Sequence, residues 1–383
     1  MSIVQIAPCF VDMYQETGGV ANIIREICLA LSKRRIKTSL ICTDTELGKI
    51  KSDSRTYAYS DFLTVHIIHQ HKNPLTGPIK NLKQLLKKIN EVELVHIHTC
   101  FSMITEYSMN YFLGSVPIIF TPHGKLSPQI MNNRRLLKKI IFNSITKANL
   151  NKISEYVCSS VNEIKYANDL GIKCKKSYIY NGYRMTEGND SRNNLGIKSK
   201  MYLLFLGYLD PRKQPDLLIR AFARSKAKST YKLVLAGPDS YHYRSTLEKI
   251  SKESGLMINK DVFLPGKVEG NYKWNLLRNA KALLLPSKAE GWPVTLAEAI
   301  GAEIPSLISK GCNFDEIEEF KIGLLVNNFS EKSWSDAIDK ICFDNSLLEI
   351  FRINLMKYKN QFSWATITKQ WIAKYKQIAF SIT

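Results

Sequence analysis

The sequence predicts an α/β protein made of two doubly wound, Rossmann-like parallel-sheet domains. Short apolar runs of strand length alternate with amphipathic helical stretches along its 383 residues, as in repeated βα units. A chain of this length holds roughly two to three domains of about 150 residues each. A polar stretch without strand pattern, near residues 184–198, separates two such series. We therefore expect a first domain over 1–183, a second over 199–360 and a C-terminal helix over 361–383.

The predicted strands of the first domain lie at residues 2–8, 37–42, 64–68, 94–98, 117–120, 155–159 and 178–180. A loop ending in Gly18 and Gly19 follows the first of them and leads into an amphipathic helix. Paired glycines let the backbone approach a ligand closely, although a simple turn is the other interpretation. The loop is not a G-x-G-x-x-G motif, which disfavours a hydride-transfer enzyme. His96 and His98 fall on one side of a strand, where we expect them to line the core or a cleft.

The predicted strands of the second domain lie at residues 202–206, 233–236, 262–264, 282–285, 304–308 and 324–326. The stretch 282–301 contains a strand, a polar loop and a helix that Pro293 opens and Gly301 ends. Such a junction points free N–H groups beyond the carboxyl edge of the sheet. We expect them to hold an anion such as phosphate. Glu290 and Glu298 flank the junction, and carboxylates suit hydroxyl groups, so the stretch indicates a nucleotide sugar unless both glutamates are merely solvated.

The composition is that of a globular protein, with 45% hydrophobic residues. No run of about 18 apolar residues predicts a membrane span, and the first ten residues indicate a strand rather than a signal peptide, so we expect a cytoplasmic protein. The eight cysteines form no CxxC pair and indicate reduced core thiols rather than a zinc site. The net charge of +20 fits anionic lipid, nucleic acid or a negatively charged substrate, or a lysine-rich genome.

One motif resembles a known family. Residues 290–293, Glu-Gly-Trp-Pro, followed by Glu298 and Ala299, resemble the E-x7-E motif of the family 4 retaining glycosyltransferases, which have the GT-B fold of two such domains facing a cleft. The resemblance implies that Glu298 binds the ribose of a nucleotide-sugar donor and that Glu290 binds the donor sugar. It further implies that the donor site includes the neighbouring residues Gly291, Trp292, Pro293, Val294 and Thr295.

Other segments resemble motifs of the same family, in the same order. Pro122-His123-Gly124 resembles its PHG segment, so His123 is expected beside the donor sugar and acceptor. The Gly18-Gly19 loop corresponds to a loop that faces the diphosphate.

The segment from Gly207 to Lys213 resembles G-R-L-x-x-x-K, whose Arg and Lys clamp the diphosphate. Lys213 matches, whereas Tyr208 replaces the Arg, and Arg212 is the candidate substitute. The last helix is similar to one that crosses back to the first domain in this family.

The implied reaction moves a sugar from a UDP- or GDP-sugar to a glycan or lipid-linked glycan with retention of configuration, as a hexosyltransferase of lipopolysaccharide, O-antigen, capsule or exopolysaccharide synthesis does. His123, Glu290 and Lys213 are the expected catalytic residues. No cofactor and no metal are expected, because charge on the leaving diphosphate is stabilised by Lys213 and backbone amides. The basic, apolar-edged segment 134–142 is expected to touch an anionic membrane.

Three alternatives remain. An epimerase acting on nucleotide sugars has the same architecture and would need no acceptor. A basic nucleic-acid-binding protein would need an arginine- and aromatic-rich face or a known module, and the sequence has neither. A catalytically inactive subunit is the third, because Tyr208 replaces a charged residue.

Overall fold

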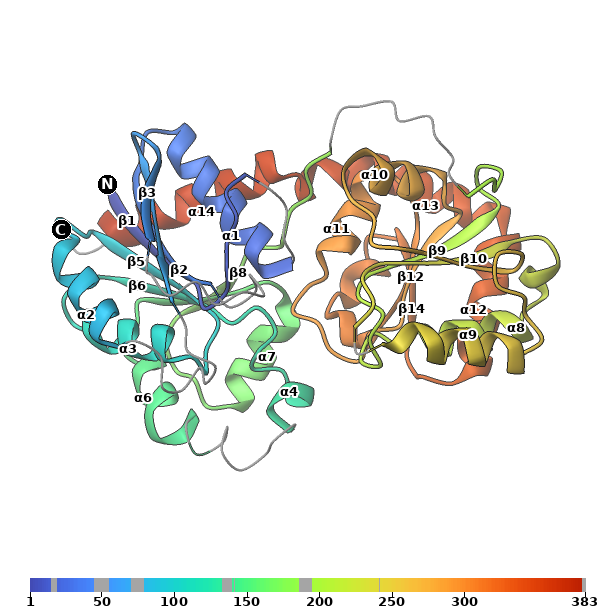
Figure 1. The fold of residues 1–383 in the computed structure, drawn as a ribbon, viewed down its shortest axis with the longest axis horizontal. Coiled ribbons are helices and arrows are strands. Elements are labelled where there is room, and N and C mark those ends of the chain that lie inside the picture. Colours follow the sequence, from blue (N-terminus) through green and yellow to red (C-terminus); the bar gives the residue numbers. More distant parts are fainter. Residues whose placement is uncertain are drawn as a thin grey trace. The chain divides into compact units, whose positions relative to one another are not determined.

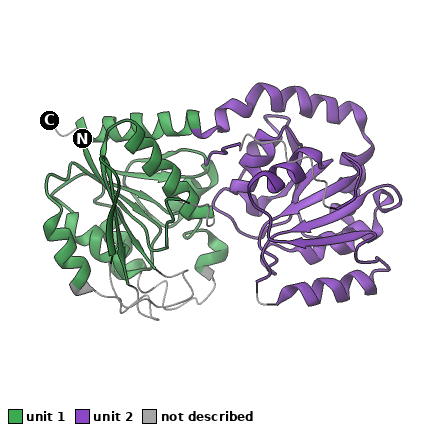
Figure 2. Ribbon diagram, turned by 45° about the horizontal axis from the view of Figure 1, so that its top comes forward, with its two compact units in different colours: residues 1–180, 365–383 green, residues 181–364 purple. Residues whose placement is uncertain are grey.

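The computed structural model describes residues 1–14, 19–44, 55–69, 79–132, 140, 142–185, 195–240 and 242–380. The chain divides into two compact units (Figure 2). Unit 1 contains Met1–Tyr180 and Ala365–Thr383, and unit 2 contains Asn181–Trp364. Each unit is a Rossmann-like α/β domain around a parallel sheet, which confirms the predicted fold class. The cleft stays a prediction.

Unit 1 has an eight-stranded sheet of order β3-β4-β2-β1-β5-β6-β7-β8 (Figure 1). The strands are β1 (Ser2–Ile6), β2 (Lys37–Thr43), β3 (Arg55–Ser60), β4 (Leu63–Ile68), β5 (Leu94–His98), β6 (Ile118–Thr121), β7 (Glu155–Cys158) and β8 (Lys176–Tyr178). All neighbours in this sheet pair in parallel except β3 and β4. The antiparallel strand β3 was missed, because an exposed edge strand needs no apolar run.

Helices cover both faces of this sheet. They are α1 (Gly19–Lys33), α2 (Ile79–Lys88), α3 (Met103–Phe112), α4 (Pro128–Asn132), the π-helix η1 (Phe142–Thr146), α6 (Lys147–Leu150), α7 (Val161–Asp169) and α14 (Trp364–Ala379). Helices α2 and α3 share a core with Val4 and Ile6 of β1, whereas α1 packs on the other face against Leu40 and Val65. Helix α14 packs on the same face as α1, where Tyr375 reaches Gln5 of β1.

Unit 2 has a six-stranded, fully parallel sheet of order β11-β10-β9-β12-β13-β14. Its strands are β9 (Tyr202–Leu206), β10 (Lys232–Ala236), β11 (Val262–Gly266), β12 (Ala282–Leu285), β13 (Ser306–Ser309) and β14 (Gly323–Val326). Helices α8 (Pro215–Arg224), α9 (Tyr243–Glu253) and α12 (Glu331–Phe343) cover one face, and α10 (Gly270–Asn279), α11 (Val294–Gly301) and α13 (Asn345–Tyr358) lie on the other (Figure 1).

Two local predictions need correction. Strand β8 occupies Lys176–Tyr178 and not 178–180. Helix α11 starts after Pro293, which is its N-cap, and it runs through Gly301 to a C-cap at Ala302. Gly301 is required by packing rather than as a helix stop, because a Cβ there would lie 2.4 Å from the ring of Tyr183.

Two predicted features fall outside the described residues in whole or in large part. The basic segment 134–142 is described only at Ile140 and Phe142, and the linker 184–198 lacks 186–194. The division of the chain at 180/181 and at 364/365 lies within a few residues of the expected bounds at 183 and 361.

Candidate functional site

Four neighbouring loops of unit 2 are tied together at the carboxyl edge of its sheet. The loops are connected by hydrogen bonds between backbone atoms. The N–H of Leu209 donates to the carbonyl of Pro238 at 2.9 Å, and the N–H of Lys288 donates to the carbonyl of Arg212 at 2.8 Å. Glu290 donates in turn to the carbonyl of Gly311 at 2.7 Å. These residues follow β10, β9, β12 and β13, so one run of hydrogen bonds crosses four adjacent strands. The loop backbones therefore hold the side chains in register.

Glycine is essential at two points of this edge. A Cβ on Gly237, where φ is +149°, would lie 1.8 Å from the carbonyl oxygen of Gly207. A Cβ on Gly311 would lie 2.1 Å from the carbonyl oxygen of Ser287. Gly207 itself directly follows β9, and its N–H donates to the carbonyl of Ala236 at 3.0 Å. Close backbone approach, rather than conformational freedom alone, selects glycine here.

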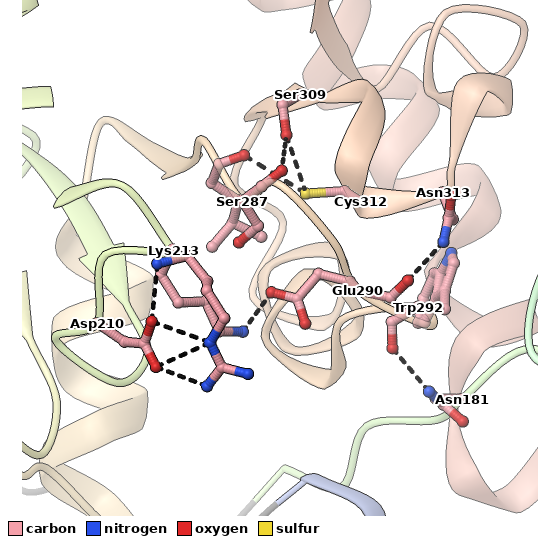
Figure 3. A network of polar contacts seen from close by, with 11 residues as sticks. Asn181, Asp210, Lys213, Ser287, Glu290, Trp292, Ser309, Cys312 and Asn313 are labelled. Carbon is pink, nitrogen blue, oxygen red and sulfur yellow. Dashed lines mark hydrogen bonds and ion pairs between the residues drawn. The ribbon is translucent and has the colours of Figure 1, made fainter. Parts of the chain in front are cut away.

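Lys213 and Glu290 meet across this edge as an ion pair (Figure 3). Lys213 follows β9 and Glu290 follows β12, its neighbour in the sheet. Their side chains are 28% and 15% exposed, so both ends are shielded but open to a ligand. The amide of Asn313 donates to the carbonyls of Glu290 and Gly291 and fixes the loop that carries the carboxylate. Two of the predicted catalytic residues are thus brought together.

Arg212 is held by Asp210, two residues earlier. The guanidinium donates to both carboxylate oxygens, with Nη2 2.6 Å from Oδ2, and the Arg212 N–H adds a bond of 2.7 Å to Oδ1. Burial acts to raise the pKa of Asp210, but the hydrogen bonds from Arg212 outweigh it and the pKa lies below its ordinary value. The side chain of Arg212 is 71% exposed and that of Tyr208 is exposed as well. Asp210 was not anticipated as the partner that orients Arg212.

Glu298 forms a second ion pair, with Lys273 of α10. Lys273 Nζ lies 2.7 Å from Glu298 Oε1, and both side chains are about nine-tenths buried. Lys273 was missed, because a single lysine in an amphipathic helix gives no signal until the facing helix α11 is known. A buried carboxylate and a buried ammonium compensate each other, and removal of one leaves the other charge buried without that partner.

The remaining residues of the predicted donor segment play different parts. Trp292 is buried, and its ring stacks on Phe362 at 5.6 Å and meets Phe314 edge-on. Its carbonyl accepts a hydrogen bond from Asn181 Nδ2 at 2.7 Å (Figure 3). The Trp292 side chain is therefore a core anchor of the loop, and any ligand contact must come from its backbone.

The start of α11 offers backbone donors. Pro293 is the N-cap and uses no side-chain cap, and no acidic residue occupies the first turn. The N–H groups of Val294 and Thr295 therefore have no acceptor within the helix. The positive end of the helix dipole adds to this local preference for an anion.

His123 belongs to unit 1 and follows β6. Its φ of +49° is in the left-handed region, which costs free energy in a non-glycine residue. Glu163 compensates by accepting hydrogen bonds from the N–H of Gly124 and from the N–H and hydroxyl of Ser159. Burial, with a smaller contribution from Lys125, lowers the pKa of His123 to about 3, so the imidazole is neutral at physiological pH.

His123 is part of a buried group of three histidines. His123 Nε2 lies 3.0 Å from Nδ1 of His98, and the rings of His96 and His98 are 3.9 Å apart. His96 and His98 were expected to line the core or a cleft, and both are buried. His98 and His123 are hydrogen-bonded to each other, whereas His96 bonds to Tyr375 and Thr121. The described part of the chain contains no group of three or more potential metal ligands.

Several predictions concern other parts of the molecule. Gly19 begins α1, and a Cβ there would meet nothing within 4 Å, while Gly18 lies outside the described residues. All eight cysteines are free thiols, six of them buried. Burial raises the pKa of the Cys312 thiol, beneath the Glu290 loop, to about 12. Among the helices that the structure describes, none is long and apolar enough to cross a membrane.

Two Rossmann-like parallel-sheet units, the second with polar loops at its carboxyl edge, define the GT-B class. Residues 17–187 match the family model Glycosyltransferase Family 4, and residues 188–357 match the model Glycosyl transferases group 1. The chain therefore belongs to the GT-B glycosyltransferases, with a family 4 domain followed by a group 1 domain.

Curated relatives match part of the chain. A D-inositol 3-phosphate glycosyltransferase of Actinosynnema mirum is 27% identical over 205 residues, 51% of this chain and 49% of its own length. An α-1,4-N-acetyl-D-galactosaminyltransferase of Campylobacter jejuni, which acts on a GalNAc-containing diNAcBac-PP-undecaprenol, is 30% identical over 174 residues, 44% of this chain and 46% of its own. The chain thus spans about half the length of the curated relatives it matches.

Solved structures match the whole chain in fold. Sucrose-phosphate synthase from Thermosynechococcus elongatus superimposes with a TM-score of 0.82 at 17% identity, over 100% of both chains. Anabaena Alr3699/HepE in complex with UDP and glucose gives a TM-score of 0.70 at 16% identity, over 98% of this chain and 100% of the other. At these identities the likeness shows the fold alone.

Proposed function

We propose that the protein transfers a sugar from a nucleotide-sugar donor to an acceptor hydroxyl, with retention of configuration. The meeting of Lys213 and Glu290 beside the start of α11 carries this proposal. A cation, free amides and carboxylates within one loop cluster suit a molecule that combines a diphosphate with two sets of hydroxyl groups. The UDP in the Alr3699/HepE structure supports a nucleotide donor of this kind.

Lys213 is assigned to the leaving diphosphate. Charge grows on that group as the glycosidic bond breaks, and an ammonium with two helix-start amides stabilises it without a metal. Lys213 forms an ion pair with Glu290. A diphosphate therefore binds by taking over the ammonium, which releases the Glu290 carboxylate to accept hydrogen bonds from sugar hydroxyls. In this scheme, binding of the donor diphosphate and release of the Glu290 carboxylate from Lys213 occur together.

Glu298 is assigned to the ribose. Its Oε1 accepts a hydrogen bond from Lys273, and a carboxylate held in this way is a suitable acceptor for the vicinal hydroxyls of a ribose. Arg212, in its bidentate pair with Asp210, supplies a second positive charge four residues after Tyr208, where the family has its Arg. Gly19, at the start of α1, is assigned to the diphosphate by the family resemblance.

His123 is assigned to hydroxyl groups of the reacting sugar and the acceptor. A neutral imidazole can accept a proton or a hydrogen bond, and burial keeps His123 neutral. We do not assign a covalent nucleophile, and the retained configuration is proposed from the family resemblance alone.

The acceptor is proposed to be a glycan or lipid-linked glycan of bacterial surface-polysaccharide synthesis. The lipid-linked acceptor in the name of the Campylobacter relative supports this, and the net charge of +20 suits work at an anionic membrane surface. The D-inositol 3-phosphate glycosyltransferase supports a phosphorylated acceptor equally well. An anionic group on the acceptor is therefore the feature that both relatives support.

A thermal-shift screen against UDP-, GDP- and ADP-sugars tests the donor assignment. Binding of the right donor at 100 times its Kd stabilises the fold by about 2.7 kcal/mol, a readily measured shift. The screen is repeated with EDTA, and transfer is then followed with the stabilising donor. No shift with any donor in wild type would refute the proposal, and loss of transfer in EDTA would refute its metal independence. Epimerised donor without acceptor would instead indicate the epimerase.

A further inference from the structure

A buried relay of hydrogen bonds runs from His123 through β5 and β1 of unit 1 to helix α14. His98 Nδ1 lies 3.0 Å from His123 Nε2, and His98 Nε2 lies 2.8 Å from Gln5 Oε1. Gln5 Nε2 lies 3.2 Å from the hydroxyl of Tyr375, which lies 2.8 Å from Nδ1 of His96. The members come from sequence positions as far apart as 5 and 375, yet all are buried.

The polarity of this relay fixes where the protons are. The carbonyl oxygen of Gln5 can only accept, so His98 Nε2 carries a hydrogen and donates. His98 is neutral, because burial lowers its pKa well below the ordinary value, and its Nδ1 therefore has a lone pair. The hydrogen between the two histidines must then belong to His123 Nε2. It follows that His123 Nδ1 carries a lone pair.

The other half of the relay is consistent with this polarity. Gln5 Nε2 donates to the Tyr375 hydroxyl, which donates in turn to His96 Nδ1. His96 Nε2 then donates to the hydroxyl of Thr121, 2.8 Å away. Turning the Gln5 amide over would reverse every bond, so the amide orientation sets the tautomers of all three histidines together. The Tyr375 hydroxyl fastens one end of that amide.

The free end of the relay is an unused acceptor. His123 Nδ1 is buried and has no hydrogen-bond partner within the described chain. A buried acceptor left without a partner is unfavourable, and a hydrogen bond from a ligand hydroxyl relieves that cost. The left-handed backbone of His123, secured by the bonds to Glu163, holds the ring in this position.

We propose that Gln5 and His98 are positioning residues that lock His123 in its Nε2–H tautomer, so that Nδ1 accepts a hydrogen bond from a hydroxyl of the sugar or acceptor. The identity of that hydroxyl rests on the proposed function, whereas the tautomer does not. Tyr375 extends the control to α14, the helix that follows directly on unit 2 in the sequence.

Histidine nitrogen NMR of the full chain tests the tautomer directly. The protein has seven histidines, so labelling with ¹⁵N-histidine gives a small set of ring signals, and His98→Leu and His123→Gln spectra assign the two that matter. At pH 7.5 we expect both rings to show a protonated Nε2 and a bare Nδ1. A His123 ring protonated at Nδ1, or at both nitrogens, would overturn the proposal.

Two matched variants separate positioning from simple packing. Asn at position 98 offers an amide oxygen near the place of the His98 Nδ1 lone pair, so His98→Asn should keep the Nε2–H tautomer of His123, while His98→Leu should lose it. Gln5→Met, which preserves volume but cannot accept a hydrogen bond, should give a mixture of His123 tautomers.

The kinetic effect is measured with the donor and acceptor identified by the thermal-shift screen. His98→Leu and Gln5→Met should lower kcat about tenfold, the effect of one hydrogen bond of about 1.4 kcal/mol. The kcat of His98→Asn should be closer to that of the wild type.

The NMR and kinetic outcomes are independent. The predicted tautomers in a chain without transferase activity would refute the proposed function and leave the relay intact. Unaltered His123 tautomer in both His98→Leu and Gln5→Met would refute the relay, whatever the activity.

Discussion

The ammonium of Lys213 pairs with the carboxylate of Glu290, 77 residues later in the chain. The two residues lie on loops that follow adjacent strands, β9 and β12, and hydrogen bonds between the loop backbones hold them in register. The Glu290 carboxylate therefore holds the Lys213 ammonium. An incoming diphosphate therefore competes with Glu290 for Lys213, and this competition governs the first prediction.

Lys213→Ala should abolish donor-induced thermal stabilisation and lower kcat/KM at least 100-fold, because the leaving diphosphate loses its cation. Lys249→Ala is the matched control, since Lys249 also pairs with a carboxylate, Glu253, but is 75% exposed on α9. Calorimetric titration with the donor and steady-state kinetics measure both effects. Equal donor affinity in the two variants would contradict the diphosphate role.

Glu298→Ala should lose ribose binding and also destabilise the fold by about 3–5 kcal/mol, because it leaves the Lys273 ammonium buried without its carboxylate. Replacing both residues, as Lys273→Met with Glu298→Met, should restore much of the stability but none of the donor binding. Urea unfolding gives the free energies, and calorimetry gives the affinities. Donor binding by the double variant would show that Glu298 is purely structural.

Tyr208→Arg should strengthen donor binding, because it restores the arginine that the family carries at this position. The exposed Tyr208 side chain leaves room for the change. An added charged hydrogen bond of about 1.5–3 kcal/mol corresponds to roughly a 10- to 150-fold lower donor Kd. Salt titration of the Kd is the readout, with Tyr208→Gln as the uncharged control. A donor Kd in Tyr208→Arg that matches the control would indicate that Arg212 already fills the role.

The buried neutral His123 should make stability fall with acid. In the unfolded chain its pKa is about 6.5, whereas burial and Lys125 lower it to about 3 in the fold. Between these values the unfolded state binds a proton that the native state does not, so the free energy of unfolding falls by up to about 1.4 kcal/mol per pH unit as the pH drops. Above pH 6.5 this contribution to stability is complete.

Urea unfolding of wild type and His123→Gln at pH 7.5, 6.5, 5.5 and 4.5 measures this slope by difference, because the other titrating groups remain in both proteins. The variant should lose less stability on acidification. If the free energies of unfolding of the two proteins changed in parallel with pH, His123 would have the same pKa in the native and the unfolded state.

Gly237→Ala should destabilise unit 2 by about 3 kcal/mol or more, because its Cβ would overlap the carbonyl oxygen of Gly207 1.8 Å away. Gly114→Ala is the control, since Gly114 also has a positive φ but a Cβ there meets nothing within 4 Å. It should cost about 1 kcal/mol from backbone strain alone. Similar losses in the two variants would contradict the close approach of β9 and β10 loops.

Much of the architecture could be predicted because its signals are local. Apolar runs such as 202–206 and 282–285 have strand length, and the loops that follow parallel strands must share one edge of the sheet. The edge strand β3 escaped this reasoning, because only alternate side chains, Tyr57 and Tyr59, pack on the core and no continuous apolar run marks the strand. Gly301 was predicted to end a helix, but glycine is needed there because the ring of Tyr183 packs against it. Tyr183 lies more than a hundred residues earlier, so no local pattern could indicate this contact.

The sequence alone determined the two series of βα units and the candidate residues at strand ends and helix starts, among them His123, Lys213, Glu290 and Glu298. Only the tertiary structure decided which side chains are partners. It paired Lys213 with Glu290, joined Lys273 to Glu298 and linked Gln5 to Tyr375 across 370 positions. The physical reason is that periodicity reports the environment of one segment, whereas a partner is selected by strand order and by the packing of one helix on another.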